Sequence, residues 1–344
     1  MELLSVTMNE GIKRRSEIEG KDNSSDDKSN YKIVHIGDMV YNSMRMWQGA
    51  SGISQYHGIV SPAYTVLKPK MSITNEFFAA LFKTRKLVQT FQKNSQGLTS
   101  DTWNLKYPQI APIKISVPNL PEQNKIAKLL TLLDLRIKQQ ERLVSFFKSY
   151  KRGLSIAIFD KKSLITNSTI RTVTLGSFCN IIMGQSPDSA SYNTEGVGLP
   201  LVQGNADMKN GITTPTKYTS NPTKTCDAGE IILSVRAPVG SVGVSNQKIC
   251  LGRGVCSISS PNNDYILQYL KHCEKQWRTL EQGGTFTAIS GDDIKNFPLM
   301  LPNDTEIENI VRLLKGLDNL ISRQELQLEK LIYCKQGLLQ SLFI

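Results

Sequence analysis

Two stretches decide the fold of this sequence. Residues 121–159 read PEQNKIAKLLTLLDLRIKQQERLVSFFKSYKRGLSIAIF, and residues 303–343 read NDTEIENIVRLLKGLDNLISRQELQLEKLIYCKQGLLQSLF. Neither stretch contains a proline beyond its first residue, and in both of them apolar residues recur at alternating steps of four and three. This heptad spacing is typical of helices that pack along a partner in a coiled coil. The sequence therefore predicts two long helices.

Each predicted helix presents a seam of mostly apolar residues. A helix of about 37 residues is roughly 55 Å long, which exceeds the diameter of a small domain, so each must pack along a partner. The other long helix is the simplest partner, and two amphipathic helices in separate cores would not need heptads sustained over so many turns. The predicted seam residues are Ile126, Leu130, Leu133, Ile137, Gln140, Val144 and Phe147, and Ile310, Leu314, Leu317, Ile321, Gln324, Leu328 and Leu331.

The two stretches are copies of one another, related by a shift of 184 residues. Both seams are interrupted by glutamine at the fifth position, Gln140 and Gln324, and by lysine at the eighth, Lys151 and Lys335. A chance heptad pattern would not repeat its polar interruptions in register, so the sequence contains an internal duplication. Polar residues on a seam can fix its register, because a slipped alignment would leave them unpaired.

The duplication extends into the regions ahead of the helices. Residues 37–54 match residues 229–245, and the spacing Arg-x3-Gly-x2-Gly-x-Ser begins at Arg45 in the first copy and at Arg236 in the second. β-rich runs bounded by Gly, Pro, Asn and Ser predict short strands, and each copy also carries one shorter helical pattern. The predicted strands are 39–43, 231–235 and 255–258, and the predicted shorter helices are 75–93 and 263–281.

We therefore predict an α/β (α+β) fold with two globular modules and two long antiparallel coiled-coil helices, related by a pseudo-twofold repeat. The predicted modules are residues 1–119 and 161–302, and the predicted long helices are residues 120–160 and 303–344. The first module is shorter at its front, because the 28 residues that would match 172–199 have no counterpart at the start of the chain.

Composition limits the classes of function. The 344 residues include 41 Lys and Arg against 30 Asp and Glu, for a net charge of +11, which favours a polyanionic partner such as nucleic acid. The sequence contains no apolar run of the ~18–20 residues that a membrane span needs and no apolar signal-peptide core at its start, so we expect a cytoplasmic protein. Its three histidines lie far apart and its six cysteines form no C-x-x-C pair, so we expect neither a metal site nor disulfides.

Motifs for catalysis are not found. The sequence contains no phosphate-binding G-x-x-x-x-G-K-[ST] loop and no G-x-G-x-x-G that opens a helix after a strand. Residues 184–186, Gly-Gln-Ser, lack the second glycine of a nucleophile elbow. Asp188 and Glu195 resemble a nuclease acidic pair, but Val197 stands where a lysine would be needed. We therefore expect no catalytic residues and no enzymatic activity.

Polar side chains that could bind DNA gather on glycine-containing turns. Arginine, glutamine and asparagine can contact base edges with two hydrogen bonds, and arginine can also neutralise phosphates. For any single residue the alternative is a solvated loop side chain, and for Arg45 and Arg236 it is a structural ion pair. The candidate DNA-binding residues are Arg45, Trp47, Gln48, Ser51, Gln55, Gln96 and Thr99, and Gln185, Ser186, Arg236, Ser241, Arg253, Gln282, Thr285 and Thr287.

Several of these segments resemble a known family. Residues 229–243, GEIILSVRAPVGSVG, and residues 251–256, LGRGVC, closely resemble the target recognition domain of Type I restriction–modification specificity subunits. Residues 298–302 leading into 307–317, and also residues 115–130, resemble the entry to the conserved helices of that family. The order of recognition domain, helix, recognition domain and helix is the plan of the whole family, so the resemblance covers nearly the full chain.

The resemblance implies a function. In this family each recognition domain reads one half of a bipartite site in double-stranded DNA, and two antiparallel helices set the spacing between the halves. Two methyltransferase (M) subunits dock on the specificity subunit, and restriction (R) subunits join that core. S-adenosylmethionine, ATP and Mg are then expected only in the partner subunits, and this chain is expected to hold no cofactor.

Two other hypotheses remain. The first is a fused enzyme or accessory nuclease, which the missing catalytic motifs argue against. The second is a truncated or silent member of the same family that does not support restriction or methylation, and the short front of the first module is its only support. Site-specific DNA methylation after co-expression with a methyltransferase partner would separate the silent member from the functional specificity subunit.

Overall fold

The computed structural model describes residues 1–8, 10–22, 24–69, 72–100, 102–160, 170–279 and 288–343. The chain divides into two compact units, which are described separately below. Unit 1 comprises Met1–Leu143 and Gln324–Ile344, and unit 2 comprises Val144–Arg323. Each unit therefore contains one globular module together with part of both long helices.

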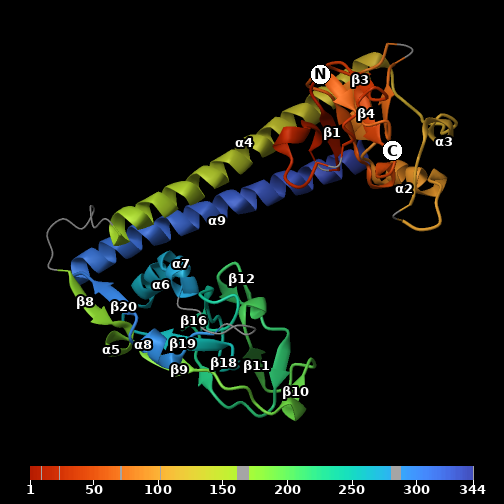
Figure 1. The fold of residues 1–344 in the computed structure, drawn as a ribbon. Coiled ribbons are helices and arrows are strands. Elements are labelled where there is room, and N and C mark those ends of the chain that lie inside the picture. The colour runs from red at the N-terminus through yellow and green to blue at the C-terminus, as the bar shows by residue number, and fades with distance from the viewer. Residues whose placement is uncertain are drawn as a thin grey trace. The chain divides into compact units, whose positions relative to one another are not determined.

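The prediction of two long helices is confirmed. They are α4 (Leu120–Phe159) and α9 (Asp304–Ser341), which form the two long ribbons in Figure 1. Along α4, residues off the predicted seam such as Leu132 and Leu135 are more than half exposed. Seven of the fourteen predicted seam residues are half-buried, and seven are buried: Ile126, Leu130, Gln140, Val144, Ile310, Leu314 and Ile321.

In unit 1 the two helices are joined by a buried amide pair. The Gln140 side chain is 3% exposed, and its Nε2 donates to the Gln324 Oε1 at 2.8 Å and to the Gln324 backbone oxygen at 3.0 Å. Lys335, which follows Gln324 along α9, forms an ion pair with Asp134, which precedes Gln140 along α4. These two contacts together show that the paired segments run antiparallel.

Unit 2 contains the equivalent ion pair, but here α4 supplies the lysine and α9 supplies the aspartate. The Lys151 Nζ lies 2.6 Å from the Asp318 Oδ1, and Asp318 is the counterpart of Asp134 at the 184-residue shift. The other Asp318 oxygen accepts a hydrogen bond from the Gln268 Nε2 at 2.8 Å, so the globular module is tied to the same carboxylate. Burial lowers the pKa of the neighbouring Lys271 amine.

The globular module of unit 2 contains two sheets. A six-stranded sheet has the order β12-β13-β17-β16-β19-β9, and a five-stranded sheet has the order β10-β14-β11-β18-β15. A third pair, β8 with β20, is antiparallel. The strands are β8 (Arg171–Thr174), β9 (Asn180–Met183), β10 (Tyr192–Asn193), β11 (Leu199–Val202), β12 (Met208–Lys209), β13 (Ile212–Thr213), β14 (Lys217–Thr219), β15 (Thr225–Cys226), β16 (Ile231–Ser234), β17 (Val242–Val244), β18 (Ile249–Leu251), β19 (Val255–Ser259) and β20 (Pro298–Leu301).

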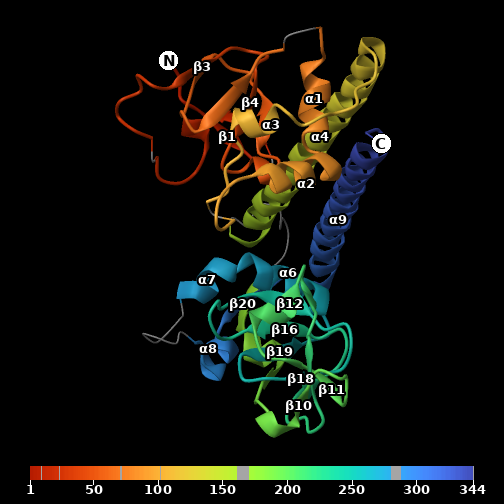
Figure 2. The same ribbon diagram turned by 90° about the vertical axis from the view of Figure 1, so that its right-hand side faces the viewer.

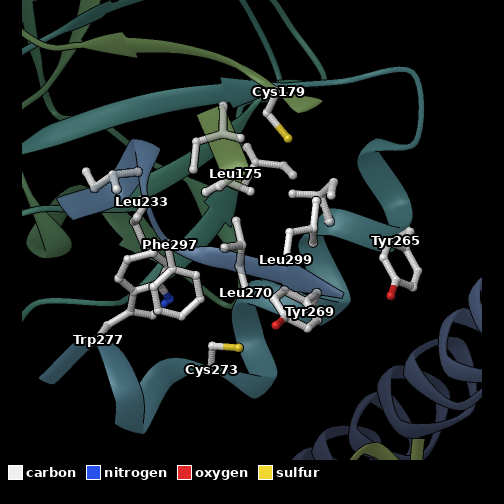
Figure 3. Close-up of a cluster of buried hydrophobic side chains, with 14 of the residues drawn as sticks. Leu175, Cys179, Leu233, Tyr265, Tyr269, Leu270, Cys273, Trp277, Phe297 and Leu299 are labelled. Carbon is white, nitrogen blue, oxygen red and sulfur yellow. The ribbon is translucent and has the colours of Figure 1, made fainter. Parts of the chain in front are cut away.

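Helices cover one face of the six-stranded sheet (Figure 2). Its core includes Trp277, which is 0% exposed and stacks on Phe297 with ring centroids 3.8 Å apart (Figure 3). The Tyr265 hydroxyl donates to the Met300 oxygen at 2.6 Å, which joins the helical layer to β20. The helices of this module are α5 (Leu175–Phe178), α6 (Asn263–His272), α7 (Glu274–Thr279) and α8 (Gly291–Lys295).

The globular module of unit 1 is smaller. It contains a three-stranded sheet with the order β5-β4-β7 and two further antiparallel pairs, β1 with β2 and β3 with β6. Its helices pack against the start of α4, and Ile126 and Leu130 belong to the same buried cluster as Phe77 and Phe91. The elements are β1 (Leu4–Thr7), β2 (Gly11–Arg14), β3 (Lys32–Val34), β4 (Met39–Asn42), β5 (Ser51–Ile53), β6 (Gly58–Val60), β7 (Tyr64–Leu67), α1 (Asn75–Leu81), α2 (Arg85–Asn94) and α3 (Tyr107–Ile110).

Matching backbone turns support the duplication of the modules. The Gly37 N–H donates to the Ser54 oxygen at 2.8 Å in unit 1, and the Gly229 N–H donates to the Ser245 oxygen at 2.7 Å in unit 2. Both glycines have a φ of +88°, a left-handed conformation that side chains disfavour. The two copies therefore repeat the same local geometry as well as the same residue spacing.

The predicted strands are confirmed, but the prediction of a single shorter helix in each module is wrong. The structure contains two helices where one was predicted over residues 75–93, and two where one was predicted over residues 263–281. In unit 1 the Thr84 hydroxyl accepts a hydrogen bond from the Leu87 N–H and begins a new helix. In unit 2 the chain leaves the helix at Cys273 and then places Trp277 in the core.

Replacing Gln140 alone with leucine is expected to lower the free energy of unfolding. The change leaves the Gln324 amide without its partner at the seam, which costs about 1–3 kcal/mol. The double change Gln140→Leu/Gln324→Leu removes both amides and should recover most of that loss. Gln139→Leu, at an exposed position of α4, is the matched control. Urea denaturation measures the four proteins, and equal losses for the single and double variants would contradict the amide pair.

Thiol labelling of the native chain is expected to modify one cysteine quickly. Cys334 on α9 is exposed, whereas the other five cysteines are buried. Burial raises the pKa of the Cys179 thiol to about 11 and that of the Cys273 thiol to about 12, so both stay protonated at pH 8. A disulfide reagent should therefore release one equivalent rapidly, and Cys334→Ser should abolish that phase. Rapid release of several equivalents would contradict the described packing.

Candidate nucleic-acid interface

In unit 2, polar side chains from three strand ends gather at one end of the six-stranded sheet. Gln185 follows β9, Arg236 follows β16, and Arg253 precedes β19. These ends coincide because β19 is antiparallel to both of its neighbours, β16 and β9. At about 4.8 Å between strands, the row from β17 to β9 is roughly 14 Å wide. That width is similar to the ~12 Å of the DNA major groove.

The loop after β9 is bonded to the turn before β19. The Gln185 N–H donates to the Leu251 oxygen at 2.9 Å, and the Gly184 N–H donates to the Val255 oxygen at 3.0 Å. The Ser186 Oγ accepts from the Arg253 backbone N–H at 3.3 Å. The structure therefore brings Arg253 together with two other candidates, Gln185 and Ser186, which lie more than 60 positions earlier in the sequence.

Two glycines hold Arg253 at the tip of its turn. A side-chain carbon at Gly254 would lie 2.1 Å from the Gln203 oxygen, and one at Gly252 would lie 3.1 Å from Gln203. The turn therefore packs tightly against the end of β11, while the Arg253 side chain is exposed. Sequence reasoning missed Gln203, whose Nε2 donates to the Tyr192 hydroxyl at 3.4 Å beside this turn. Its position directly after the apolar residues Leu201 and Val202 was the available signal.

A second turn carries Arg236. The Ser234 Oγ donates to the Pro238 oxygen at 2.8 Å and accepts from the Ser241 N–H at 2.9 Å, which closes the turn. Gly240 has a φ of +89°, and a side-chain carbon there would lie 2.8 Å from Trp277. The turn is thus fixed against the core, and the Arg236 side chain is exposed on its outer side.

In unit 1, the turn after β4 carries Arg45 and Trp47. The Trp47 ring meets the Trp103 ring edge to face, with centroids 5.1 Å apart and an interplanar angle of 81°. The Leu105 N–H donates to the Ser43 oxygen at 2.8 Å, so the loop that contains Trp103 lies beside this turn. Sequence reasoning missed Trp103, although an aromatic residue in a polar loop was a signal that could have found it.

The other candidates of unit 1 fall into two groups. Gln48 is exposed on the same turn as Trp47, and Gln96 and Thr99 are exposed on the neighbouring loop. Ser51, in contrast, is 0% exposed, and its Oγ donates to the Gly49 oxygen at 3.3 Å. Gln55 is exposed, but it follows the end of β5. The opposite end of β5, its start, is the one that lies beside the turn of Arg45. We therefore leave Ser51 and Gln55 out of the candidate surface.

Three predicted residues cannot be placed. Gln282, Thr285 and Thr287 lie outside the described residues. The segment that follows them returns to the candidate surface, because Ala288 forms a β-bridge with Arg236 and the Ile289 N–H donates to the Val235 oxygen at 3.0 Å.

The chemistry of the surface is that of binding. Arg45, Arg236 and Arg253 are exposed, and none of them forms an ion pair with any residue that the structure describes. Over the same part of the chain, no group of three or more His, Cys, Asp or Glu side chains is placed to hold a metal ion. The helices within the described ranges include none that is long and apolar enough to span a membrane.

Known proteins resemble this chain over most of its length. A family profile described as Type I restriction modification DNA specificity domain matches residues 9–144 and 167–331. The putative type I restriction enzyme MjaX specificity subunit of Methanocaldococcus jannaschii is 28% identical over 350 aligned positions, which cover 94% of this chain and 81% of that protein.

Solved structures give the same result. A structure described as the structural basis underlying complex assembly and conformational transition of the type I R-M system is 26% identical, with a TM-score of 0.65 over 92% of this chain and 84% of that one. The HsdS subunit from Thermoanaerobacter tengcongensis is 25% identical, with a TM-score of 0.53 over 92% of this chain and 83% of that one.

Replacing Gly254 with alanine is expected to destabilise unit 2. The added carbon would lie 2.1 Å from the Gln203 oxygen, and forcing such a contact to relax costs about 1–3 kcal/mol. Gly204→Ala is the matched control, because its added carbon would have nothing within 4 Å. Urea denaturation should show a lower midpoint for the first variant and an unchanged midpoint for the second. Equal midpoints would contradict the tight packing of the Arg253 turn.

Proposed function

Because this chain belongs to the family of Type I restriction–modification DNA specificity proteins, we propose that it is a non-catalytic subunit that recognises DNA through both of its modules. The family supplies the general function. The residues that contact DNA, the two-part character of the site and the partners are the proposal, and each has its own support in the chain.

The observation that carries the proposal is the set of exposed arginines on turns. Arg236 and Arg253 lie at one end of the same sheet in unit 2, and Arg45 lies at the corresponding turn of unit 1. A structural ion pair was the alternative for Arg45 and Arg236, and neither makes one with the described residues. Exposed guanidinium groups next to glutamine and serine side chains are suited to base edges and phosphates.

A two-part DNA site is supported by the differences between the copies. The two modules share the backbone turns, but at the 191-residue shift Arg253 corresponds to Pro62 and Trp47 corresponds to Pro238. Both turns keep the same hydrogen bond, from the Tyr64 N–H to the Ser61 oxygen in unit 1 and from Val255 to Gly252 in unit 2. Different side chains on one framework are what two modules need to recognise two different half-sites.

Partner subunits are supported by the outer faces of the long helices. In unit 1 the off-seam residues Leu132 and Leu135 of α4 are exposed, and in unit 2 Phe146 and Tyr150 are exposed with their rings stacked at 6.2 Å. Exposed apolar surface of this kind marks a protein interface. We propose that two methyltransferase subunits dock there and that restriction subunits join them. S-adenosylmethionine, ATP and Mg would bind to those partners.

One observation favours the silent family member as the second candidate. In unit 1, β7 is the edge strand of the three-stranded sheet. In unit 2 the equivalent strand, β19, is paired on its far side with one more strand, β9. If that difference prevents unit 1 from recognising its half-site, co-expression with methyltransferase subunits will produce no site-specific methylation. Methylation at a two-part site supports the main proposal.

Alanine at Arg253 is expected to weaken recognition of one half-site. The change removes a guanidinium group that can contact a base with two hydrogen bonds, which costs about 1–3 kcal/mol. Gel-shift assays of the full chain assembled with its methyltransferase subunits would use DNA with either half-site altered. The variant should lose discrimination at the half-site of unit 2 and keep it at the other.

Arg45→Ala is the reciprocal control and should affect only the half-site of unit 1. The salt dependence of the affinity separates base contacts from phosphate contacts, because a lost phosphate contact lowers the slope against salt by about one. Loss of affinity for all sequences alike, with a lower slope, would contradict base recognition by Arg253. Unchanged binding by both variants would contradict the proposed surface.

A further inference from the structure

Two of the three histidines meet on neighbouring strands of unit 1. His35 follows β3 and His57 precedes β6, and these strands are antiparallel with Val34 opposite Gly58. The next pair along the ladder is therefore His35 opposite His57. Their rings are in contact, with centroids 5.5 Å apart and an interplanar angle of 78°. Strand pairing thus brings together two imidazoles that lie 22 positions apart in the sequence.

Both imidazoles are available to bind a ligand. His35 and His57 are exposed, and neither ring forms a hydrogen bond or an ion pair with any residue that the structure describes. A neutral imidazole without such a partner keeps one nitrogen lone pair for an incoming ligand. His272 differs, because its Nε2 lies 2.7 Å from the Asp160 Oδ1 and its side chain is only 10% exposed.

Unit 2 contains an ion pair at the same place in the repeat. β15 is antiparallel to β18, with Cys226 opposite Ile249. The next pair along this ladder is Asp227 opposite Lys248, and the Lys248 Nζ lies 3.5 Å from the Asp227 Oδ1. The side chains at this position therefore join an edge strand of the five-stranded sheet to its neighbour.

The turn that follows establishes the correspondence between the two pairs. The His35 N–H donates to the Asp38 Oδ2 at 2.9 Å, and the Asp227 N–H donates to the Glu230 Oε1 at 3.2 Å. The glycine between them accepts the same left-handed backbone in both units. His35 is therefore the structural counterpart of Asp227, and His57 is the counterpart of Lys248. One framework carries two histidines in unit 1 and two opposite charges in unit 2.

The distance between the two rings fits a metal ion that both of them bind. Imidazole nitrogen binds Zn²⁺ at about 2.0–2.1 Å and lies about 1.1 Å from its ring centre, so two rings on a tetrahedral ion have centres about 5 Å apart. The observed 5.5 Å is close to that value. Both lone pairs must point at the ion, and the broad χ2 torsion of histidine lets exposed rings turn to do so.

The chemistry of the pair selects the class of ion. Imidazole suits Zn²⁺, Ni²⁺ and Cu²⁺, whereas Mg²⁺ and Ca²⁺ prefer oxygen ligands. Within the described ranges no third His, Cys, Asp or Glu joins the two histidines in a metal-binding group. Water would therefore complete the coordination of the ion, as it does at open zinc sites.

We propose that His35 and His57 together bind one divalent transition-metal ion such as Zn²⁺, and that this ion joins β3 to β6 where an ion pair joins β15 to β18 in unit 2. The site is separate from the candidate DNA-binding turn, because His35 precedes β4 and Arg45 follows it. The ion would make the pairing of this edge strand depend on metal, and it would take no part in the proposed contacts with DNA.

Calorimetric titration of the full chain with Zn²⁺ tests the site. All proteins carry Cys334→Ser, which removes the exposed thiol. The parent should bind one ion, and Mg²⁺ should not compete. His35→Asp/His57→Lys introduces the residues of unit 2 on the same framework and should weaken zinc binding by about tenfold or more. Absence of zinc binding by the parent, or unchanged affinity in this variant, would overturn the proposal.

Asp227→His/Lys248→His is the reciprocal variant. It places two histidines on the equivalent strands of unit 2, which have the same register as those of unit 1. The number of zinc ions bound should therefore rise from one to two. A variant that still binds a single ion would overturn the claim that the paired strands create the site.

Hydrogen exchange locates the bound ion. Zn²⁺ should slow exchange of the amides in residues 32–34 and 58–60 several-fold in the parent and leave them unchanged in His35→Asp/His57→Lys, because the ion joins these two strands. Residues 225–226 and 249–251 of unit 2 are the internal control. Zinc-dependent protection that is confined to other segments would overturn the proposal. DNA is absent from all of these measurements, so their failure would leave the proposed function intact.

Discussion

The structure depends on the pairing of two long helices through a few buried polar contacts. Gln140 bonds to Gln324 on a mostly apolar seam, and a slip of either helix would leave both amides unpaired at about 1–3 kcal/mol each. The ion pairs follow the same rule, because Asp134 of one copy meets Lys335 of the other, and Lys151 meets Asp318. Each half of the seam therefore needs residues from both copies of the repeat.

The duplicated modules combine a common framework with different exposed side chains. Glycine turns, strand pairing and the hydrogen bonds around them recur in both units, and these features set where the turn residues lie. The side chains at the tips differ, with Arg253 in unit 2 and Pro62 at the corresponding position of unit 1. A framework of this kind can change the DNA sequence that it recognises without changing its fold.

The sequence predicted the long helices, the repeat and the central strands, because these depend on local periodicity and spacing. It did not predict the break at Cys273, which is set when Trp277 packs against Phe297 in the core. Gln185 and Arg253 were both candidates, but their proximity depends on the pairing of β9 with β19, which no local pattern encodes. Trp103 carried a local signal, as an aromatic residue in a polar loop, but only the fold places it against Trp47.

Selection from a pool of random duplexes tests the central claim most directly. The full chain, assembled with its methyltransferase subunits, would be incubated with the pool, and the bound DNA would be sequenced. The account predicts two separate blocks of preferred bases at one fixed spacing, because it assigns one half-site to each module and a single register to the pair of helices. A single continuous block, or two blocks whose spacing varies freely, would contradict it.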